Sequence, residues 1–158
     1  MPQFATHRQA SACPDSQQQT GNPMRTVITY GTFDLFHVGH LRILERARAL
    51  GDRLVVAIST DEFNLLKGKR SVIPFASRAE IVAGLSCVDQ VIAEESWDQK
   101  VADILKWQAS VFVMGGDWEG KFDELRKHCE VVYLSRTDGV SSSMIKKVVG
   151  AGDFLRAA

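Results

Sequence analysis

The sequence predicts an α/β fold in which a five-stranded parallel sheet is flanked by helices, giving three layers. Apolar, β-branched runs alternate with segments of helical periodicity, and this order is repeated five times. The run from Arg53 to Ser59 is almost continuously apolar, as is typical of strands buried on both faces. Because each strand is followed by a helix, the sheet should be parallel with right-handed crossovers.

The predicted elements begin at residue 26. A strand runs to Tyr30, breaks at Gly31 and leads, after Gly39, into a helix over residues 41–50 whose apolar side chains recur at helical spacing. Gly51 is the expected stop of this helix, and Gly150 that of the last one. Further strands are expected at 53–59, 89–93, 110–114 and 130–134, and further helices at 61–66, 77–85, 96–108, 122–128 and 141–149.

Three of these helices carry N-terminal signals. Ser77-Arg-Ala-Glu80 reads as a capping box, and Ser96-Trp-Asp-Gln99 has the same pattern. Ser141 or Ser142 can cap the last helix.

The chain is expected to contain one folded domain, over residues 24–150. With 158 residues, 45% apolar and 24% charged, it can bury one core. Residues 1–23 are rich in Gln and Ser and lack periodicity, so we expect a flexible polar N-terminal tail, and residues 151–158 should form a C-terminal tail.

Composition excludes several function classes. A formal net charge of zero argues against nucleic acid as a partner, because that would normally demand a basic face. No apolar run approaches the roughly 18 residues of a membrane span, and the N-terminus lacks the apolar segment of a signal peptide. The expected location is the cytoplasm, without a membrane partner. The three scattered cysteines fit reduced thiols there.

The loop after the first strand carries Thr32, Asp34, His37 and His40. It lies where open α/β sheets bind ligands, and the free amides of a helix N-terminus suit phosphate. In a helical first turn both imidazoles can face one phosphate group, and Gly39 leaves the approach open. The alternatives are a surface loop with incidental histidines or a zinc pair, although two histidines without a nearby third ligand make a poor zinc site.

Cations follow in later segments. Lys67-Gly-Lys-Arg70 lies on a loop that leaves the same edge of the sheet and could supply countercharge to a triphosphate, although such a run is also typical of a solvated loop. Arg78, expected in the first turn of its helix, is either a phosphate ligand or part of a surface ion pair. Lys100 is a further candidate anion ligand.

Two more loops follow predicted strands at the same edge of the sheet. Gly115-Gly-Asp-Trp118 lets the backbone approach a base or ribose, and Asp117 can accept hydrogen bonds from hydroxyl or amino groups; the competing interpretation is a plain turn. Arg136 precedes a hydroxyl-rich helix start, which is either a second anion site or an ordinary capped helix.

At these residues a resemblance becomes specific. Gly31-Thr-Phe-Asp34 with His37-Val-Gly-His40 resembles the signature of the HxGH nucleotidyltransferases, which implies a Rossmann-like fold and nucleotide transfer to a phosphate-bearing acceptor. Asp117-Trp-Glu-Gly-Lys-Phe-Asp123 and Arg136-Thr-Asp-Gly-Val-Ser-Ser142 are similar to the glycerol-3-phosphate cytidylyltransferase family. The resemblance covers residues 24–147 and makes residues 24–150 a catalytic domain.

That family joins CTP and sn-glycerol 3-phosphate to give CDP-glycerol and pyrophosphate, uses a divalent cation such as Mg²⁺, and is commonly homodimeric. Our hypothesis for the mechanism is direct in-line attack by an oxygen of the acceptor phosphate on the α-phosphorus of CTP, with His37, His40, Lys67 and Arg136 as catalytic residues. Lys67 and Lys100 are assigned to the acceptor, with Asp34 and Arg78 as further candidates, and no residue is assigned to the metal. The nucleotide-binding residues implied, with Asp117 added from its loop, are Thr32, Phe33, His37, Val38, Gly39, His40, Lys69, Arg136, Thr137, Asp138, Gly139, Val140, Ser141, Ser142 and Ser143.

Two alternatives stay open at this point. The first keeps the chemistry but uses ATP, or accepts another phosphorylated alcohol or a sugar phosphate. The second is a nucleotide sensor that binds without turnover, although the presence of both histidines and both flanking lysines speaks against it.

Overall fold

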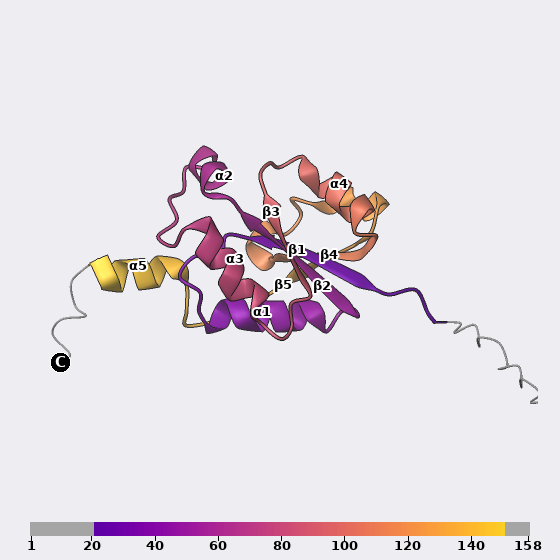
Figure 1. Ribbon diagram of the computed structural model, residues 1–158, viewed down its shortest axis with the longest axis horizontal. Helices are drawn as coiled ribbons and strands as arrows, with labels where there is room; N and C mark the ends of the chain where they lie inside the picture. The colour runs from indigo at the N-terminus through magenta and orange to yellow at the C-terminus, as the bar shows by residue number, and fades with distance from the viewer. Residues whose placement is uncertain (1–20, 151–158) are drawn as a thin grey trace, which may run out of the picture.

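The computed structural model describes residues 21–150, so the predicted C-terminal tail and most of the predicted N-terminal tail lie outside the described residues. Five strands form one sheet in the order β3-β2-β1-β4-β5, and every neighbouring pair is parallel. Figure 1 shows the sheet with helices on both sides. The predicted α/β fold with a five-stranded parallel sheet is confirmed.

The strands match the predicted runs to within a residue or two. They span β1 Thr26–Gly31, β2 Arg53–Ser59, β3 Gln90–Glu94, β4 Ala109–Gly115 and β5 Glu130–Leu134. β1 and β2 are buried along nearly their whole length, which is why their sequences are almost continuously apolar or β-branched.

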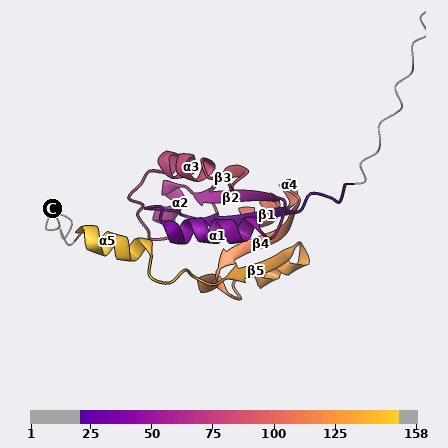
Figure 2. The ribbon, with the colours of Figure 1, turned by 90° about the horizontal axis from the view of Figure 1, so that it is seen from below.

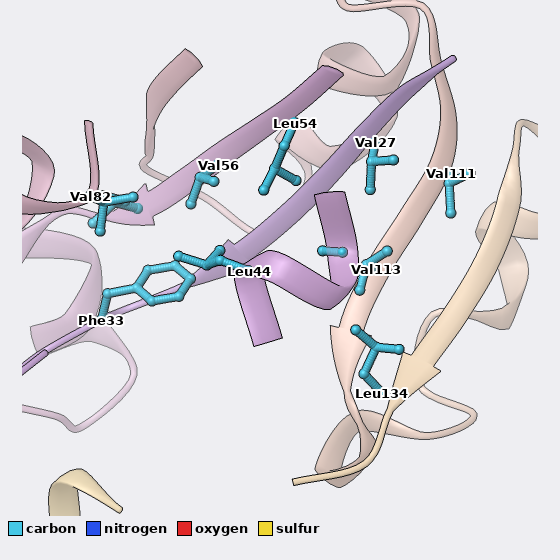
Figure 3. Close-up of a cluster of buried hydrophobic side chains, with 11 residues drawn as sticks. Val27, Phe33, Leu44, Leu54, Val56, Val82, Val111, Val113 and Leu134 are labelled. Carbon is cyan, nitrogen blue, oxygen red and sulfur yellow. The ribbon is translucent and has the colours of Figure 1, made fainter. Parts of the chain in front are cut away.

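Five helices and two 3₁₀ turns accompany the sheet among residues 21–150. They are α1 Val38–Arg48, α2 Asp61–Leu66, α3 Phe75–Ala83, α4 Gln99–Lys106 and α5 Ser142–Gly150, with 3₁₀ turns η1 Gly116–Trp118 and η2 Asp123–Lys127. Leu44 of α1 and Val82 of α3 pack with Val27 and Val113 on one face, as Figure 3 shows. Ile104 of α4 and Leu125 of η2 pack on the other face. Figure 2, seen from below, shows α5 extending beyond this body.

The predicted helix starts need correction. α3 begins at Phe75 rather than at a capping box from Ser77, and Asp61 Oδ2, from a distant turn, accepts the Phe75 amide at 2.9 Å. α4 begins at Gln99, whose side chain accepts the amides of Glu95 and Ser96. The expected helix at 122–128 is the shorter 3₁₀ turn η2.

The first helix starts earlier than predicted, at Val38, and ends at Arg48 before Gly51. Gly51 has a different role from the expected helix stop. A Cβ there would lie 2.4 Å from the Arg25 carbonyl oxygen, so the glycine permits close approach of two backbone segments.

The strand order fixes where a ligand can bind. From β1 the chain proceeds to β2 and β3 on one side, and then returns to β4 on the other side of β1. The carboxyl ends of β1 and β4 therefore flank a topological switch point, the usual crevice for ligands in open α/β sheets.

Candidate active site

A cleft of about 530 Å³ opens at this switch point. It is lined by residues from the ends of β1 and β4, the first turn of α1, the loop after α2 and the segment leading into α5. The predicted site residues in its lining are Thr32, Phe33, Asp34, His37, Gly39, His40, Lys69, Asp117, Arg136, Thr137, Val140, Ser141, Ser142 and Ser143. Val38, Lys67, Arg78, Lys100, Asp138 and Gly139 are outside the lining.

The two histidines form one stacked unit at the start of α1. Their ring centroids lie 3.9 Å apart with an interplanar angle of 21°. His37 is the N-cap residue, and its Nδ1 accepts the Gly39 amide at 3.1 Å, while His40 Nδ1 accepts the His37 amide at 3.4 Å. The histidine pair is therefore itself a capping box, a device for which Ser or Thr with Glu is the usual sequence signal.

This capping fixes the chemistry of both rings. A neutral imidazole whose Nδ1 accepts a hydrogen bond carries its proton on Nε2. Burial lowers the pKa of His40 to about 4, with the neighbouring His37 as the second cause and Asp34 opposing. Burial also lowers the pKa of His37. Both rings are therefore neutral at pH 7, and each carries its proton on Nε2. His37 Nε2 lies 3.5 Å from Ser142 Oγ, a contact that a ligand would replace.

Gly39 permits close packing of the His37 ring and the loop before α5. A Cβ on Gly39 would lie 2.9 Å from the His37 ring and 3.1 Å from Val140 of the loop before α5. Any side chain here would push the N-cap imidazole or the facing loop aside. The glycine thus allows the two predicted anion-binding segments to come together.

Asp34 organises the cleft instead of standing free. Its carboxylate accepts the amides of Val72 and Ile73 at 2.8 and 2.9 Å and pairs with Lys146 Nζ at 2.9 Å. Burial alone would raise the pKa of Asp34, but these hydrogen bonds and the Lys146 charge together lower it. Asp34 is therefore a fixed anion that ties the loop after α2, and α5, to the end of β1.

Arg136 and Asp117 face each other across the cleft mouth. Arg136 Nε lies 2.9 Å from Asp117 Oδ2, and both side chains are more than half exposed. Such an exposed pair contributes little to stability. The guanidinium is thus available to leave Asp117 for an anionic ligand.

Arg78 is in a place that the sequence did not indicate. Its side chain is 1% exposed. Its guanidinium donates to the carbonyl oxygens of Ile73, Thr32 and Ser59 and pairs with Asp61. The expectation of an anion ligand or a surface ion pair is not met in this structure, because Arg78 lies in the fourth position of α3 and faces inward.

Lys67 and Lys100 meet at Glu94, next to the cleft but outside its lining. Lys100 Nζ lies 2.7 Å from Glu94 Oε1, and Lys67 Nζ lies 3.7 Å from Glu94 Oε2. The ring of Tyr30, which does line the cleft, is 4.5 Å from Lys100 Nζ. Two lysines separated by 33 positions thus converge on one carboxylate.

Several lining or supporting residues were not found by sequence reasoning. Lys146 falls within a segment that was interpreted only as a helix start, and Glu94 opens the polar stretch Glu94-Glu-Ser96, in which nothing distinguishes it from its neighbours. Asn64 is fully buried, lies 3.2 Å from the Thr32 hydroxyl and donates to Ser71. Of these residues, only Lys146 could have been predicted from the sequence, because it lies one helical turn beyond Ser142, which was already a candidate.

Metal and membrane features were searched over residues 21–150. No group of three or more His, Cys, Asp or Glu side chains that could hold a metal ion occurs in this part of the chain. None of the helices described here has the length and apolar character needed to cross a bilayer.

Fold and site together define a nucleotide-binding α/β domain of the HxGH type. A model of the cytidylyltransferase-like family matches residues 28–148, so the chain belongs to this family. The chain is 56% identical over 126 residues to the glycerol-3-phosphate cytidylyltransferase of Bacillus subtilis, covering 80% of this chain and 98% of that protein.

A further relative supports the family, and a solved structure supports the fold. The glycerol-3-phosphate cytidylyltransferase of Staphylococcus aureus is 52% identical over 124 residues, covering 78% of this chain and 94% of that protein. Among solved structures, the lipopolysaccharide core biosynthesis protein of Thermoplasma volcanium superposes with a TM-score of 0.63 at 25% identity, covering 73% of this chain and 99% of that one.

Proposed function

We propose that this protein is a cytidylyltransferase that transfers CMP from CTP to sn-glycerol 3-phosphate, giving CDP-glycerol and pyrophosphate. The observation that carries the proposal is the convergence of His37, His40, Lys69 and Arg136 on one cleft. The chain surrounding that cleft is 52–56% identical to glycerol-3-phosphate cytidylyltransferases.

The reaction is a direct in-line displacement. An oxygen of the acceptor phosphate attacks the α-phosphorus of CTP, the new P–O bond forms, and the bond from the α-phosphorus to its bridging oxygen breaks to release pyrophosphate. A phosphate dianion is already a competent nucleophile, so the protein needs to supply only alignment and charge stabilisation.

The histidine pair stabilises the charge that develops on the transferring group. Each Nε2–H donates a hydrogen bond, one to an α-phosphate oxygen and the other to the bridging oxygen. The N-terminus of α1 adds roughly half a unit of positive charge at the same place. Donors fixed before the reaction are effective because they need no reorganisation as the charge builds up.

Cations from two other segments hold the departing pyrophosphate. Lys69 comes from the loop after α2, and Arg136 from the segment after β5. The hydroxyl groups of Ser141 to Ser143 lie at the start of α5, where free backbone amides favour an anion. Arg136 exchanges its exposed partner Asp117 for a phosphate oxygen as CTP binds.

The nucleoside lies at the carboxyl end of β4. Met114, Gly115 and Trp118 line the cleft there and offer apolar contact and open backbone to a flat base. Asp117, released from Arg136, accepts a hydrogen bond from the cytosine amino group or the ribose hydroxyls.

A divalent cation, Mg²⁺ in our proposal, would be held mainly by the phosphate oxygens of CTP. Mg²⁺ is usually bound through substrate phosphates and only one or two carboxylates, so the triphosphate itself would supply most of its ligands. When bound, it neutralises charge on the triphosphate. We also propose that the protein works in the cytoplasm as a homodimer. A sedimentation analysis that finds only the monomer would contradict the homodimer.

An acceptor panel tests the proposal. Four nucleoside triphosphates are combined with glycerol 3-phosphate, phosphoethanolamine, phosphocholine and a sugar phosphate, and pyrophosphate release is measured. We expect CTP with sn-glycerol 3-phosphate to be preferred. A preference for ATP or another acceptor would correct the partners, whereas CTP binding without pyrophosphate release from any combination would identify a nucleotide sensor.

A further inference from the structure

A buried cluster of three charged side chains lies beside the cleft. Glu94, the last residue of β3, contacts Lys67 at the end of α2 and Lys100 in the first turn of α4. The side chains of Glu94 and Lys100 are 4% exposed and that of Lys67 is 13% exposed. Lys67 Nζ also donates to Ser59 Oγ at 2.8 Å, and the Ser59 hydroxyl donates to Glu94 Oε2.

Aromatic rings enclose the rest of this cluster. The Trp97 ring centroid lies 5.4 Å from Lys67 Nζ and 4.9 Å from Lys100 Nζ, so one ring touches both cations. Phe63 packs on Lys67 at 4.2 Å, and Tyr30 packs on Lys100 at 4.5 Å. Rings stabilise a cation through their negative faces, but they cannot replace the hydration that the buried charges have lost.

Glu94 is the only carboxylate paired with either lysine among residues 21–150. Three other charged or titratable groups lie near the cluster. Lys69 lowers the pKa of Lys67 through its charge. The Tyr30 hydroxyl donates a hydrogen bond to Asp103 at 2.8 Å. The two ammonium groups therefore depend on one counter-ion.

We infer that Glu94 is the positioning residue of the acceptor subsite, whose carboxylate holds the ammonium groups of Lys67 and Lys100 next to each other so that together they can receive the acceptor's phosphate. This inference rests on the proposed function and on the assignment of both lysines to the acceptor phosphate, which the family resemblance implies. Glu94 itself does not touch the acceptor and acts only through the two ammonium groups.

The physical reason is a balance of charges in a dry site. Burial lowers the pKa of Lys67, the Glu94 carboxylate opposes this, and Lys69 and Lys100 lower it further. Without the carboxylate, two buried ammonium groups would repel each other, and the pKa of Lys67 would fall further. A neutral amine cannot attract a phosphate dianion, so acceptor binding would then require uptake of a proton.

The variant Glu94→Gln tests this with little change in shape. We expect its KM for glycerol 3-phosphate to rise with pH and to exceed the wild-type value by about tenfold at pH 8, because Lys67 loses its proton as pH rises through the lowered pKa. The KM for CTP should stay near the wild-type value. At pH 8 the acceptor is already a dianion, since the second pKa of a phosphate monoester is about 6, so its own titration does not interfere.

Two further variants separate charge from shape. Glu94→Asp keeps the carboxylate and should restore a KM that is flat between pH 6.5 and 8, even if its absolute value changes. Glu95→Gln removes the same charge at the adjacent, exposed position, which makes none of the ion pairs found between residues 21 and 150, and should behave as wild type.

Calorimetry gives a readout that does not depend on turnover. Glycerol 3-phosphate is titrated at pH 8 into each protein in two buffers of different ionisation enthalpy. We expect Glu94→Gln to take up a substantial fraction of a proton on binding, and the wild-type protein and Glu94→Asp to take up almost none.

The outcomes distinguish this inference from the proposed function. If the wild-type protein releases pyrophosphate but Glu94→Gln shows an unchanged, pH-independent KM, the role of Glu94 is wrong and the function stands. If no acceptor is turned over, the function is wrong and the calorimetric comparison alone decides the role of Glu94. A uniform loss of CTP and acceptor binding in Glu94→Gln at every pH would show a merely structural role and would overturn the inference.

Discussion

Two neutral imidazoles carry the proposed transition-state stabilisation. By analogy with loss of one oxyanion donor, His37→Ala or His40→Ala should lower kcat by about 10²- to 10³-fold, roughly 3 to 4 kcal/mol. Pyrophosphate release at saturating CTP and acceptor is the measurement. His128→Ala, an exposed histidine outside the cleft lining, is the matched control, and unchanged turnover in either cleft variant would remove that histidine from the mechanism.

The lowered pKa of His40 also predicts how stability depends on pH. His40 has a folded pKa of about 4 against an ordinary value of 6.5, so the unfolded chain binds its proton first as pH falls. Stability is therefore retained above pH 6.5 and is lost progressively towards pH 4, by on the order of 2 to 3 kcal/mol.

Urea denaturation of the wild-type protein and of His40→Gln between pH 7.5 and 4.5 checks this. Glutamine does not titrate, so the variant should lose distinctly less stability across the window. Parallel curves for the two proteins would show that other groups cause the acid sensitivity.

Single residues also show where sequence reasoning stopped. The histidines, Lys69, Arg136 and the serines before α5 all line the cleft as predicted, because their positions follow from strand ends in a parallel sheet. Arg78 was misplaced because its environment is made by carbonyl groups of Thr32, Ser59 and Ile73, and no local pattern shows which carbonyl groups will be turned inward.

Among the elements, α5 is held to the domain mainly by polar contacts. Ser142 Oγ donates to the Asp34 carbonyl at 2.8 Å, and Lys146 Nζ pairs with the Asp34 carboxylate and donates to the Arg70 carbonyl. The same helix exposes Met144, Val148 and Val149 and has no fully buried residue. Its position therefore depends on the Asp34 anion more than on apolar packing.

Lys146→Met should loosen this helix. We expect backbone amides of α5 to exchange with deuterium several-fold faster in the variant, because the helix loses its ion pair and a hydrogen bond to the body. Lys147→Met, the adjacent exposed lysine without such a contact among the described residues, is the control. Equal exchange in both variants would show that Ser142 and side-chain packing suffice.

Helix starts were the least predictable elements, for a physical reason visible at α3. The sequence indicated Ser77 as the N-cap residue. In the structure, the amide of Phe75, the first residue of α3, donates instead to Asp61, which lies 14 residues earlier in the chain. A cap supplied from another element leaves no signature in the local sequence. Strands were found within a residue or two because burial on both faces demands continuous apolar runs.

At the scale of the whole molecule, one aromatic side chain of the sheet packs in the core on the side that α4 covers. Phe112 of β4 is fully buried and packs on Tyr30 and Phe122, with centroids 5.6 and 5.4 Å apart. Phe112→Ala should lower the free energy of unfolding by about 3 to 5 kcal/mol, through lost burial and the cavity that remains.

Urea denaturation at pH 7.5 measures this loss. Ile81→Ala, at a 46% exposed position on α3, should change stability by only about 0.5 kcal/mol and serves as control. Similar losses in both variants would contradict the assignment of Phe112 to the core.

The sequence predicted the parallel sheet but not its strand order. The alternation of strands and helices determines that neighbouring strands run parallel, whereas the return of β4 to the free side of β1 depends on how whole helices pack. The location of the cleft was nevertheless predictable, because any such order brings the strand ends to one edge.

The absence of antiparallel pairs in this sheet has a consequence for how the chain folds. Each rung of the ladder joins distant residues: Thr26 pairs with Arg53 on one side and with Ala109 on the other. No hairpin can form early as a local nucleus, so large loops must close before β1 gains either neighbour, and refolding should be slow for a domain of this size. The central strand β1, which also supports the histidine loop, has both of its neighbours only after β4 has paired with it. Nucleotide binding and a late step of folding should therefore appear together.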